Sequence, residues 1–320
     1  MDVFHGYDHV PPGARGASVA IGNFDGVHKG HQALIARARQ EAVPLAALTG
    51  AILFEPHPRE FFQPSRPLFT LTPLPQKLRL LERYGVDLAF VLPFAHELAQ
   101  MSAEAFVERV LVAGLGVRHV VIGYDFLFGK SRAGNAQQMA ELGRAMGFGV
   151  SIVPPVGSGG EVYSSSAVRA ELAQGDVEGA AQMLGHRWKV EGVVQGGARR
   201  GTGLGYPTAN IALGKGAALA HGIYAVHVEF EGTRYQAAAY LGTRPTFDDG
   251  SPVLEVFLFD FDGDLYGRRI EVEFVDFLRG DRKFDSLEAL KAQMDIDCAR
   301  AREVLTADAE RSAPVGRNGQ

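Results

Sequence analysis

The stretch that decides the fold reads VAIGNFDGVHKGHQ and covers residues 19–32. Its first four residues are apolar and end in glycine, which predicts a short buried strand. A helix is expected directly afterwards, through Gln32–Glu41. Two histidines, His28 and His31, therefore flank Gly30 where that helix begins. Free backbone N–H groups at a helix N-terminus attract anions, so this turn is a candidate phosphate site.

Short apolar runs continue to alternate with helical stretches as far as residue 153. The predicted strands are Val19–Gly22, Ala46–Phe54, Leu88–Leu92, Val117–Gly123 and Gly149–Val153. The predicted helices are Gln32–Glu41, Pro75–Tyr84, Ala103–Leu111 and Ala136–Met146. This alternation favours a Rossmann-like α/β domain, in which helices cover both faces of a parallel sheet and ligands bind at the carboxyl ends of the strands.

The periodicity shifts toward two after a pair of helices predicted at Ser165–Ala173 and Val177–Leu184. The strands expected beyond them are Val190–Val194, Ile223–Glu229, Tyr235–Tyr240, Val253–Phe259 and Ile270–Phe277. Turns rich in Gly, Asp and Pro separate these strands, which is typical of a small antiparallel β-barrel. A last helix over Leu287–Leu305 carries apolar residues on one face and is expected to pack on the barrel.

These patterns predict an α/β domain at residues 1–184 and a barrel domain with a C-terminal helix at residues 185–306. The polar segment 307–320 has no hydrophobic pattern and is expected to be a disordered tail. The length of 320 residues also favours two domains, with a single large α/β domain as the alternative.

Composition and charge narrow the class of protein. The net charge is −5 without long runs of one sign, which argues against a general nucleic-acid or membrane-surface binder. The single cysteine, Cys298, excludes an internal disulfide and suits a reducing compartment. Met1–Gly13 does not have the pattern of a signal peptide, and no apolar run approaches the ~20 residues of a membrane span. We expect a cytoplasmic protein that binds small molecules, and the sequence leaves its oligomeric state open.

The histidine-containing turn permits two interpretations when its residues are taken one by one. Gly26 and Gly30 let the backbone approach phosphates, and the imidazoles can donate hydrogen bonds to charge that builds up on a phosphoryl group. A lone histidine or a glycine-rich turn is, however, often structural. The ordered combination of strand, H-x-G-H and helix is more specific than any of its parts.

With strand, H-x-G-H and helix in this order, the sequence resembles the nucleotidylyltransferase superfamily. More narrowly, Gly22–His31 resembles the adenylyltransferase half of the bacterial bifunctional riboflavin kinase/FAD synthetase family. Later segments support the resemblance: FEPHP at 54–58, GYDFLFG at 123–129 and SSSAVR at 164–169. Tyr163 departs from the aliphatic residue expected before the serines. The resemblance implies that His28, His31 and Arg169 are catalytic. The residues that it implies for binding are Gly22, Asn23, Phe24, Asp25, Gly26, Gly30, His57, Asp125, Phe128, Ser164, Ser165 and Ser166.

Structural alternatives exist for several of these residues. Phe126 and Phe128 alternate as core residues do, Ser164–Ser166 could form an ordinary helix N-cap, and His57 between two prolines could belong to a rigid loop. The implied chemistry, transfer of an adenylyl group from ATP to FMN, needs no general base because the attacking phosphate is already ionised. Alignment and charge neutralisation are then sufficient. The sequence contains no G-x-x-x-x-G-K-[ST] motif, so a P-loop is not expected.

A second group of motifs lies in the barrel half. Six glycines in Gly192–Gly205 provide amides that can cradle phosphates, although a mobile surface loop explains them equally well. Pro207–Asn210 reads PTAN, and in extended geometry Thr208 and Asn210 point to the same face. Their hydroxyl and amide oxygens are hard ligands of the kind that Mg²⁺ prefers.

The second group resembles the riboflavin kinase family. The matching segments are PTAN, GTRPTF at 242–247, LEVFLFDFDGDLYG at 254–267, and the trailing FLR and KF at 277–279 and 283–284. The resemblance implies that Glu255 is the catalytic base and that Thr208 and Asn210 hold Mg²⁺. The further binding residues that it implies are Gly201, Gly203, Gly205, Pro207, Thr243 and Arg244. A departure at Gly185–Trp188 is interpreted as variation in the linker.

Phosphorylation of riboflavin requires a base, because the terminal hydroxyl of riboflavin must lose a proton as it attacks the γ-phosphate. Glu255 lies on an otherwise apolar strand, where a carboxylate is costly, although an outward-facing strand residue is the structural alternative. The resemblance as a whole implies phosphorylation of riboflavin to FMN and adenylylation of FMN to FAD, with ATP as co-substrate. Two other functions stay open: an H-x-G-H transferase for another phosphorylated acceptor, and a flavin-binding regulator with an inactive barrel.

Overall fold

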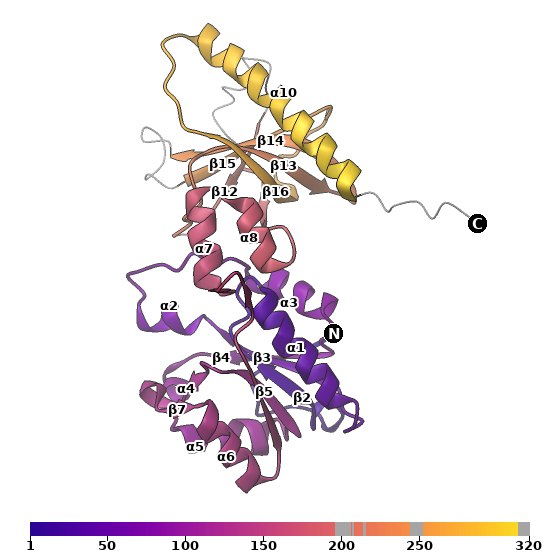
Figure 1. The fold of residues 1–320 in the computed structure, drawn as a ribbon, viewed down its shortest axis with the longest axis vertical. Coiled ribbons are helices and arrows are strands. Elements are labelled where there is room, and N and C mark those ends of the chain that lie inside the picture. The colour runs from indigo at the N-terminus through magenta and orange to yellow at the C-terminus, as the bar shows by residue number, and fades with distance from the viewer. Residues whose placement is uncertain (196–205, 207, 214–215, 244–251, 313–320) are drawn as a thin grey trace, which may run out of the picture. The chain divides into compact units, whose positions relative to one another are not determined.

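The computed structural model describes residues 1–195, 206, 208–213, 216–243 and 252–312. The chain forms two compact units, Met1–Ser165 and Ser166–Gln320 (Figure 1). The predicted boundary between residues 184 and 185 differs from this division because most of helix α7 (Ser165–Gln174) and all of helix α8 (Val177–Leu184) belong to the second unit, in which α8 packs on β16. The backbone N–H of Ala220, for example, donates to the carbonyl of Leu172 on α7 at 3.0 Å.

The first unit is built on a six-stranded parallel sheet in the order β1-β4-β3-β2-β5-β8. The strands are β1 (Asp2–His5), β2 (Ser18–Ile21), β3 (Thr49–Glu55), β4 (Leu88–Pro93), β5 (His119–Gly123) and β8 (Gly149–Val153). Two short hairpins, β6 (Leu127–Phe128) with β7 (Gly134–Asn135) and β9 (Gly157–Ser158) with β10 (Glu161–Val162), stand outside it. The predicted parallel α/β fold is confirmed.

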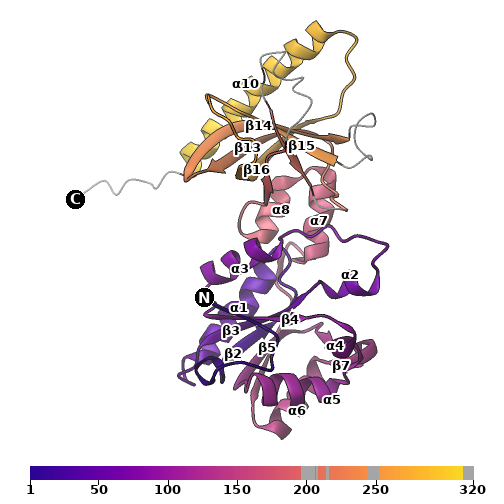
Figure 2. The same ribbon diagram turned by 180° about the vertical axis from the view of Figure 1, so that it is seen from behind.

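Helices cover both faces of this sheet (Figures 1 and 2). Ala20 on β2 faces α1 (Lys29–Ala42) and α3 (Leu74–Arg83), while Val19 and Ile21 face the other side. The helices of that other side are α5 (Ala103–Ala105), its continuation as a π-helix over Phe106–Gly114, and α6 (Ala136–Met146). Shorter helices are α2 (Pro58–Phe62), α4 (His96–Gln100) and the 3₁₀ turns Pro12–Ala14 and Lys130–Arg132. The alternation of buried residues along β2 therefore produces the two-sided core.

Strand β2 is the point at which the strand order reverses. From β2 the chain proceeds to β3 and β4 on one side, and later to β5 and β8 on the other side. Ligands of open parallel sheets bind outside the carboxyl ends of the strands at this kind of switch point. The H-x-G-H turn follows the carboxyl end of β2 directly, so the topology places it where such a site is expected.

Strand β1 was not predicted, because only one of its four residues is even half-buried. It adds to the edge of the sheet through parallel pairing with β4, from Asp2 opposite Leu88 to His5 opposite Val91. An exposed edge strand has no alternating burial from which sequence could identify it.

The second unit is a six-stranded antiparallel sheet in the order β11-β16-β13-β14-β15-β12, curled into a nearly closed barrel. Its strands are β11 (Lys189–Val193), β12 (Ala209–Ala212), β13 (Gly222–Phe230), β14 (Thr233–Thr243), β15 (Pro252–Leu258) and β16 (Arg269–Gly280). A bridge between Gln195 and Asn210 joins the two end strands. At Gly192 a Cβ atom would collide with Ile211, so glycine permits this close approach. The predicted barrel is confirmed, with β12 as an additional strand.

Helix α10 (Leu287–Ser312) packs across β13, β14 and β16, with Ala301 and Leu305 in the core that it shares with the sheet (Figure 1). It continues beyond the predicted end at Leu305, and part of the polar segment expected to be disordered is therefore helical. Residues 313–320 lie outside the described residues.

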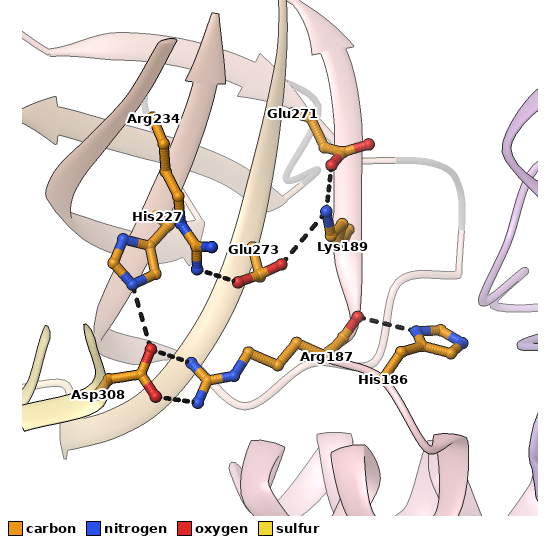
Figure 3. A network of polar contacts seen from close by, with 8 residues as sticks. All are labelled: His186, Arg187, Lys189, His227, Arg234, Glu271, Glu273 and Asp308. Atoms are coloured by element: carbon orange, nitrogen blue, oxygen red, sulfur yellow. Dashed lines mark hydrogen bonds and ion pairs between the residues drawn. The ribbon is translucent and has the colours of Figure 1, made fainter. Parts of the chain in front are cut away.

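A polar network around Asp308 accounts for the additional turns (Figure 3). Asp308 is buried on α10, forms a two-pronged ion pair with Arg187, and accepts a hydrogen bond from His227 on β13 at 3.3 Å. On the neighbouring strands the ammonium group of Lys189 forms ion pairs with Glu271, at 2.5 Å, and with Glu273. Glu273 in turn forms an ion pair with Arg234. Asp308 can contact Arg187 and His227 only while this part of α10 remains helical. These contacts therefore stabilise the C-terminal end of α10.

Candidate active sites

The turn after β2 has an unusual backbone. Phe24, Gly26 and Val27 have φ angles of 51°, 81° and 44°, and both Phe24 and Val27 are fully buried. Positive φ is unfavourable for a bulky or β-branched residue and persists only where the surroundings enforce it. This strained backbone lies between β2 and the two histidines. Strained backbone of this kind clusters at functional sites.

Asp25 is one of the groups that enforce this backbone. Its side chain is 1% exposed and accepts hydrogen bonds from the backbone N–H groups of Leu71 at 3.2 Å and Thr72 at 3.0 Å. In return, the backbone N–H of Gly26 donates to Thr72 Oγ1 at 3.0 Å. Asp25, which the resemblance assigned to binding, thus fastens the turn to the segment before α3.

The two histidines are stacked on each other. Their ring centroids are 3.7 Å apart, and the ring of Phe24 lies 5.2 Å from that of His31. A Cβ atom at Gly30 would lie 2.9 Å from Cε1 of His28 and 3.3 Å from the carbonyl oxygen of Tyr163, so the stack requires glycine here. Within the described part of the chain, Nδ1 of each histidine is buried without a hydrogen-bond partner. A buried polar atom without a partner is uncommon in folded proteins, and two of them at this turn mark it as a candidate functional site.

Burial keeps both histidines neutral at pH 7. Loss of solvation lowers the pKa of His28 to about 4 and lowers the pKa of His31 well below its usual value, with further lowering from His28 and Lys77. Neutral imidazoles donate through one ring nitrogen and accept through the other. The stack can therefore donate hydrogen bonds to a phosphoryl group without carrying a charge in the free protein.

The lowered pKa of His28 predicts that acid destabilises the first unit. The unfolded chain takes up this proton near pH 6.5 and the folded chain only near pH 4, so stability falls as the pH drops through this interval. We expect His28 alone to remove about 2 kcal/mol of unfolding free energy between pH 7 and pH 5. Hydrogen exchange of the β2 amides, corrected for intrinsic rates, measures it. In His28→Gln this part of the pH dependence should disappear, and an unchanged pH dependence would contradict the prediction.

The other residues expected in this site lie on several elements. His57 is the N-cap of α2, and its Nδ1 accepts from the backbone N–H of Arg59 at 3.1 Å. Asp125 is exposed after β5, whereas Phe128 is buried in the core and stacks with Phe126. Gly22, directly after β2, donates from its backbone N–H to the carbonyl of Ile52, and Oδ1 of Asn23 is buried without a partner among the described residues.

The serine segment reaches the same turn. Ser165 begins α7, and its hydroxyl donates to the carbonyl of Asp25 at 2.8 Å. Ser164 is half-buried beside it, and Ser166 is exposed. The structure thus brings Ser165 together with the H-x-G-H turn. Arg169 lies one turn further along α7, in the second unit.

Two features of this region were not expected from sequence. Lys77 on α3 is 3% exposed and interacts electrostatically with His31. Tyr163, noted as a departure from the family pattern, lies beneath Lys29 with the ammonium 5.5 Å from its ring centroid. A lysine on an amphipathic helix carries no signal of its own in the sequence, so only the burial of Lys77 distinguishes it.

In the barrel, strand pairing brings the principal residues together. Asn210 on β12 lies directly opposite Glu255 on β15, which in turn lies opposite Tyr240 on β14. Directly paired residues of antiparallel strands project from the same face with their Cβ atoms ~5 Å apart. Asn210 is 6% exposed and Glu255 is half-buried. The predicted base and one predicted Mg²⁺ ligand are therefore neighbours.

Tyr206 anchors the chain just before PTAN. Its hydroxyl donates to Asp295 on α10, and its ring packs edge-on against Phe257 at 5.1 Å. Burial, together with Asp295, raises the pKa of Tyr206 to about 12. Asp295 carries no motif, so sequence offered no signal for this contact.

Several expected residues fall outside the described part of the chain. Thr208 is described, half-buried directly before β12, and Thr243 ends β14. The predicted residues outside the described ones are Gly201, Gly203, Gly205, Pro207 and Arg244. Among the described residues, no group of three or more His, Cys, Asp and Glu side chains is arranged to hold a metal ion.

Comparison with known protein families also divides the chain into two parts. Residues 11–167 match the family model described as FAD synthetase, and residues 184–305 match the one described as riboflavin kinase. The fold and the two matches define a class of protein in which a nucleotidylyltransferase-type α/β unit is joined to a flavokinase-type barrel. The chain belongs to the bifunctional riboflavin kinase/FMN adenylyltransferase family.

Relatives of that name cover almost the whole chain. The one from Pseudomonas fluorescens is 40% identical over 97% of this chain and 100% of its own length. Those from Haemophilus influenzae and Escherichia coli K12 are 36% and 37% identical, over 94% and 90% of this chain and 98% and 92% of theirs.

A solved structure shares the fold. The crystal structure of a Streptococcus pneumoniae protein, described as a macrolide-efflux protein, superposes with a TM-score of 0.83 at 29% identity and covers 94% of this chain and 99% of its own. The described helices of the present chain include none that is long and apolar enough to cross a membrane.

Proposed function

We propose that this chain makes FAD from riboflavin in two ATP-dependent steps. The barrel phosphorylates riboflavin to FMN, and the α/β unit transfers an adenylyl group from a second ATP to FMN and releases pyrophosphate. The observation that carries the proposal is the presence of two separate polar sites, the stacked histidines after β2 and the Asn210–Glu255 pair. Each lies in the half of the chain that the corresponding family model matches.

In the adenylyl transfer, His28 and His31 bind the phosphates of ATP and stabilise the charge that develops at the α-phosphate. Gly22, Gly26 and Gly30 let the backbone approach the nucleotide, and Ser164–Ser166 with Arg169 hold the leaving pyrophosphate. His57, Asp125 and Phe128 contribute to binding from the neighbouring loops. The set contains no general base because the phosphate of FMN attacks in its ionised form.

In the kinase step, Glu255 removes the proton from the terminal hydroxyl of riboflavin as that hydroxyl attacks the γ-phosphate. Thr208 and Asn210 supply the hard oxygen ligands that suit Mg²⁺, and the burial of Asn210 opposite Glu255 fits that role. Mg²⁺ held by these residues would neutralise charge on the ATP phosphates. The segment containing Gly201, Gly203, Gly205 and Pro207 completes the nucleotide site, together with Thr243 and Arg244.

We assign residues 1–184 to the adenylyltransferase and 185–306 to the kinase. We also place the protein in the cytoplasm, without nucleic-acid or membrane partners, because its charge is mildly negative and its one cysteine suits a reducing compartment.

A time course tests the proposal directly. Purified protein given riboflavin and MgATP should form FMN first and FAD later, with one pyrophosphate released for each FAD. Supplying nicotinate mononucleotide or phosphopantetheine in place of FMN tests for a different acceptor. Formation of neither flavin product would overturn the proposal, and flavin binding without turnover would instead favour a regulator with an inactive barrel.

A further inference from the structure

Helix α3 carries a buried cation, Lys77, to which neither proposed reaction step assigns a role. Lys77 lies in the first turn of α3 and is 3% exposed. A buried ammonium group is costly unless opposite charges or hydrogen bonds compensate for its lost hydration. The surroundings of Lys77 therefore indicate why it is there.

The backbone places Lys77 close to the H-x-G-H turn. Three hydrogen bonds join this turn to the Leu71–Thr72 segment, through Asp25 and Gly26. Pro73 follows this segment, and its carbonyl accepts from the backbone N–H of Lys77 at 2.9 Å. Lys77 is thus one helical turn beyond the hydrogen bonds that hold the turn in its strained conformation.

The charges around Lys77 come from three different elements. Asp25 in the turn is buried, while Glu55 at the end of β3 and Glu60 in α2 are half-buried. All three carboxylates attract the Lys77 ammonium, although burial makes the larger contribution and lowers its pKa. Burial also raises the pKa of Glu55, against the attraction of Lys77. One cation thus faces three acidic groups.

The same ammonium acts on the histidine stack. His28 and Lys77 are the titratable groups that lower the pKa of His31, in addition to burial. A site for polyphosphate at this position would otherwise combine three carboxylates with the several negative charges of the ligand. Repulsion between like charges is strong where water is excluded, so a buried cation has a specific electrostatic use here.

We propose that Lys77 is a positioning residue for adenylyl transfer. Its ammonium group balances the negative charges of Asp25, Glu55 and Glu60, so that the H-x-G-H turn can accept the polyphosphate of a nucleoside triphosphate. Its charge also adds to the burial that disfavours the protonated form of His31. This inference rests on the proposed adenylyltransferase function of the first unit.

The test compares Lys77→Met with the wild type in the full-length protein, measuring both steps. We expect kcat/KM for FMN adenylylation to fall by about tenfold to a hundredfold, with a raised KM for ATP, and riboflavin phosphorylation to change less than about twofold. Loss of the cation raises the pKa of His31, so the acid limb of the adenylylation pH profile should move to higher pH. Lys77→Arg should retain most of the activity and the original pH profile.

Two further variants separate electrostatics from packing. Arg83→Met removes an exposed cation from the same helix and should leave both steps unchanged. Glu55→Gln, added to Lys77→Met, reduces the unbalanced acidic charge and should restore part of the lost adenylylation. This rescue is also informative if Lys77→Met alone folds poorly, because the double variant should then fold better.

The inference is overturned if Lys77→Met adenylylates FMN at the wild-type rate with an unmoved pH profile. It is also overturned if Glu55→Gln gives no rescue in an otherwise folded double variant. A wild-type protein that does not adenylylate FMN at all would instead refute the proposed function, so the two failures are distinguishable.

Discussion

Replacing His31 by alanine is expected to abolish FAD formation from FMN while leaving riboflavin phosphorylation unchanged. The substitution removes one ring of the stacked pair and, with it, a buried nitrogen that has no partner within the described residues. Loss of a preorganised hydrogen-bond donor to a developing charge lowers rates by roughly 10²–10³. Because the stack also orients His28, the loss should be at the upper end of that range.

Both activities should be measured on one preparation, with FMN supplied for the second step and riboflavin for the first. His96→Ala is the matched control, since His96 is an exposed histidine in α4 of the same unit. An equal loss of both activities in His31→Ala would contradict the assignment of the two steps to the two units.

The Glu255 substitution should have the opposite pattern. Glu255→Ala, or the nearly isosteric Glu255→Gln, is expected to lower FMN formation from riboflavin by roughly 10²–10⁴, the usual contribution of a general base. Adenylylation of supplied FMN should continue at the wild-type rate. The physical reason is that the hydroxyl of riboflavin, unlike the phosphate of FMN, carries a proton that must leave.

Glu229→Gln provides the control because Glu229 is an exposed carboxylate on β13 of the same sheet. A kinase rate that survives Glu255→Gln would mean that this carboxylate has another role on the strand.

Most of the secondary structure was predictable because apolar residues recur along the chain at the spacing and run length typical of strands and helices. The strand at β2 and the helix at α8 follow directly from apolar spacing, and the predicted bounds of α8, Val177–Leu184, agree with the structure. The edge strand β1 was missed because it buries too little to leave a pattern. Helix α10 extends past Leu305 because Asp308 has partners on distant elements.

The candidate sites were predictable as motifs but not as arrangements. H-x-G-H and PTAN can be recognised from residue types at fixed spacing. Asp25, which belongs to the first motif, turns out to hold the turn against Leu71 and Thr72 through hydrogen bonds that no local pattern reveals. Lys77 lies outside every motif, and its burial results from the packing of α3 beside that turn.

The amino-acid sequence by itself determined the two-part organisation, the parallel and antiparallel sheet classes, and the family to which the chain is similar. These follow from local periodicity and from short motifs in a fixed order, which depend only on neighbours along the chain. Tertiary structure alone decided the stacking of His28 on His31, the pairing of Asn210 with Glu255 and the burial of Lys77. The physical reason is that burial and strand register arise when residues distant in sequence exclude water together, and these set the charge and orientation of each group.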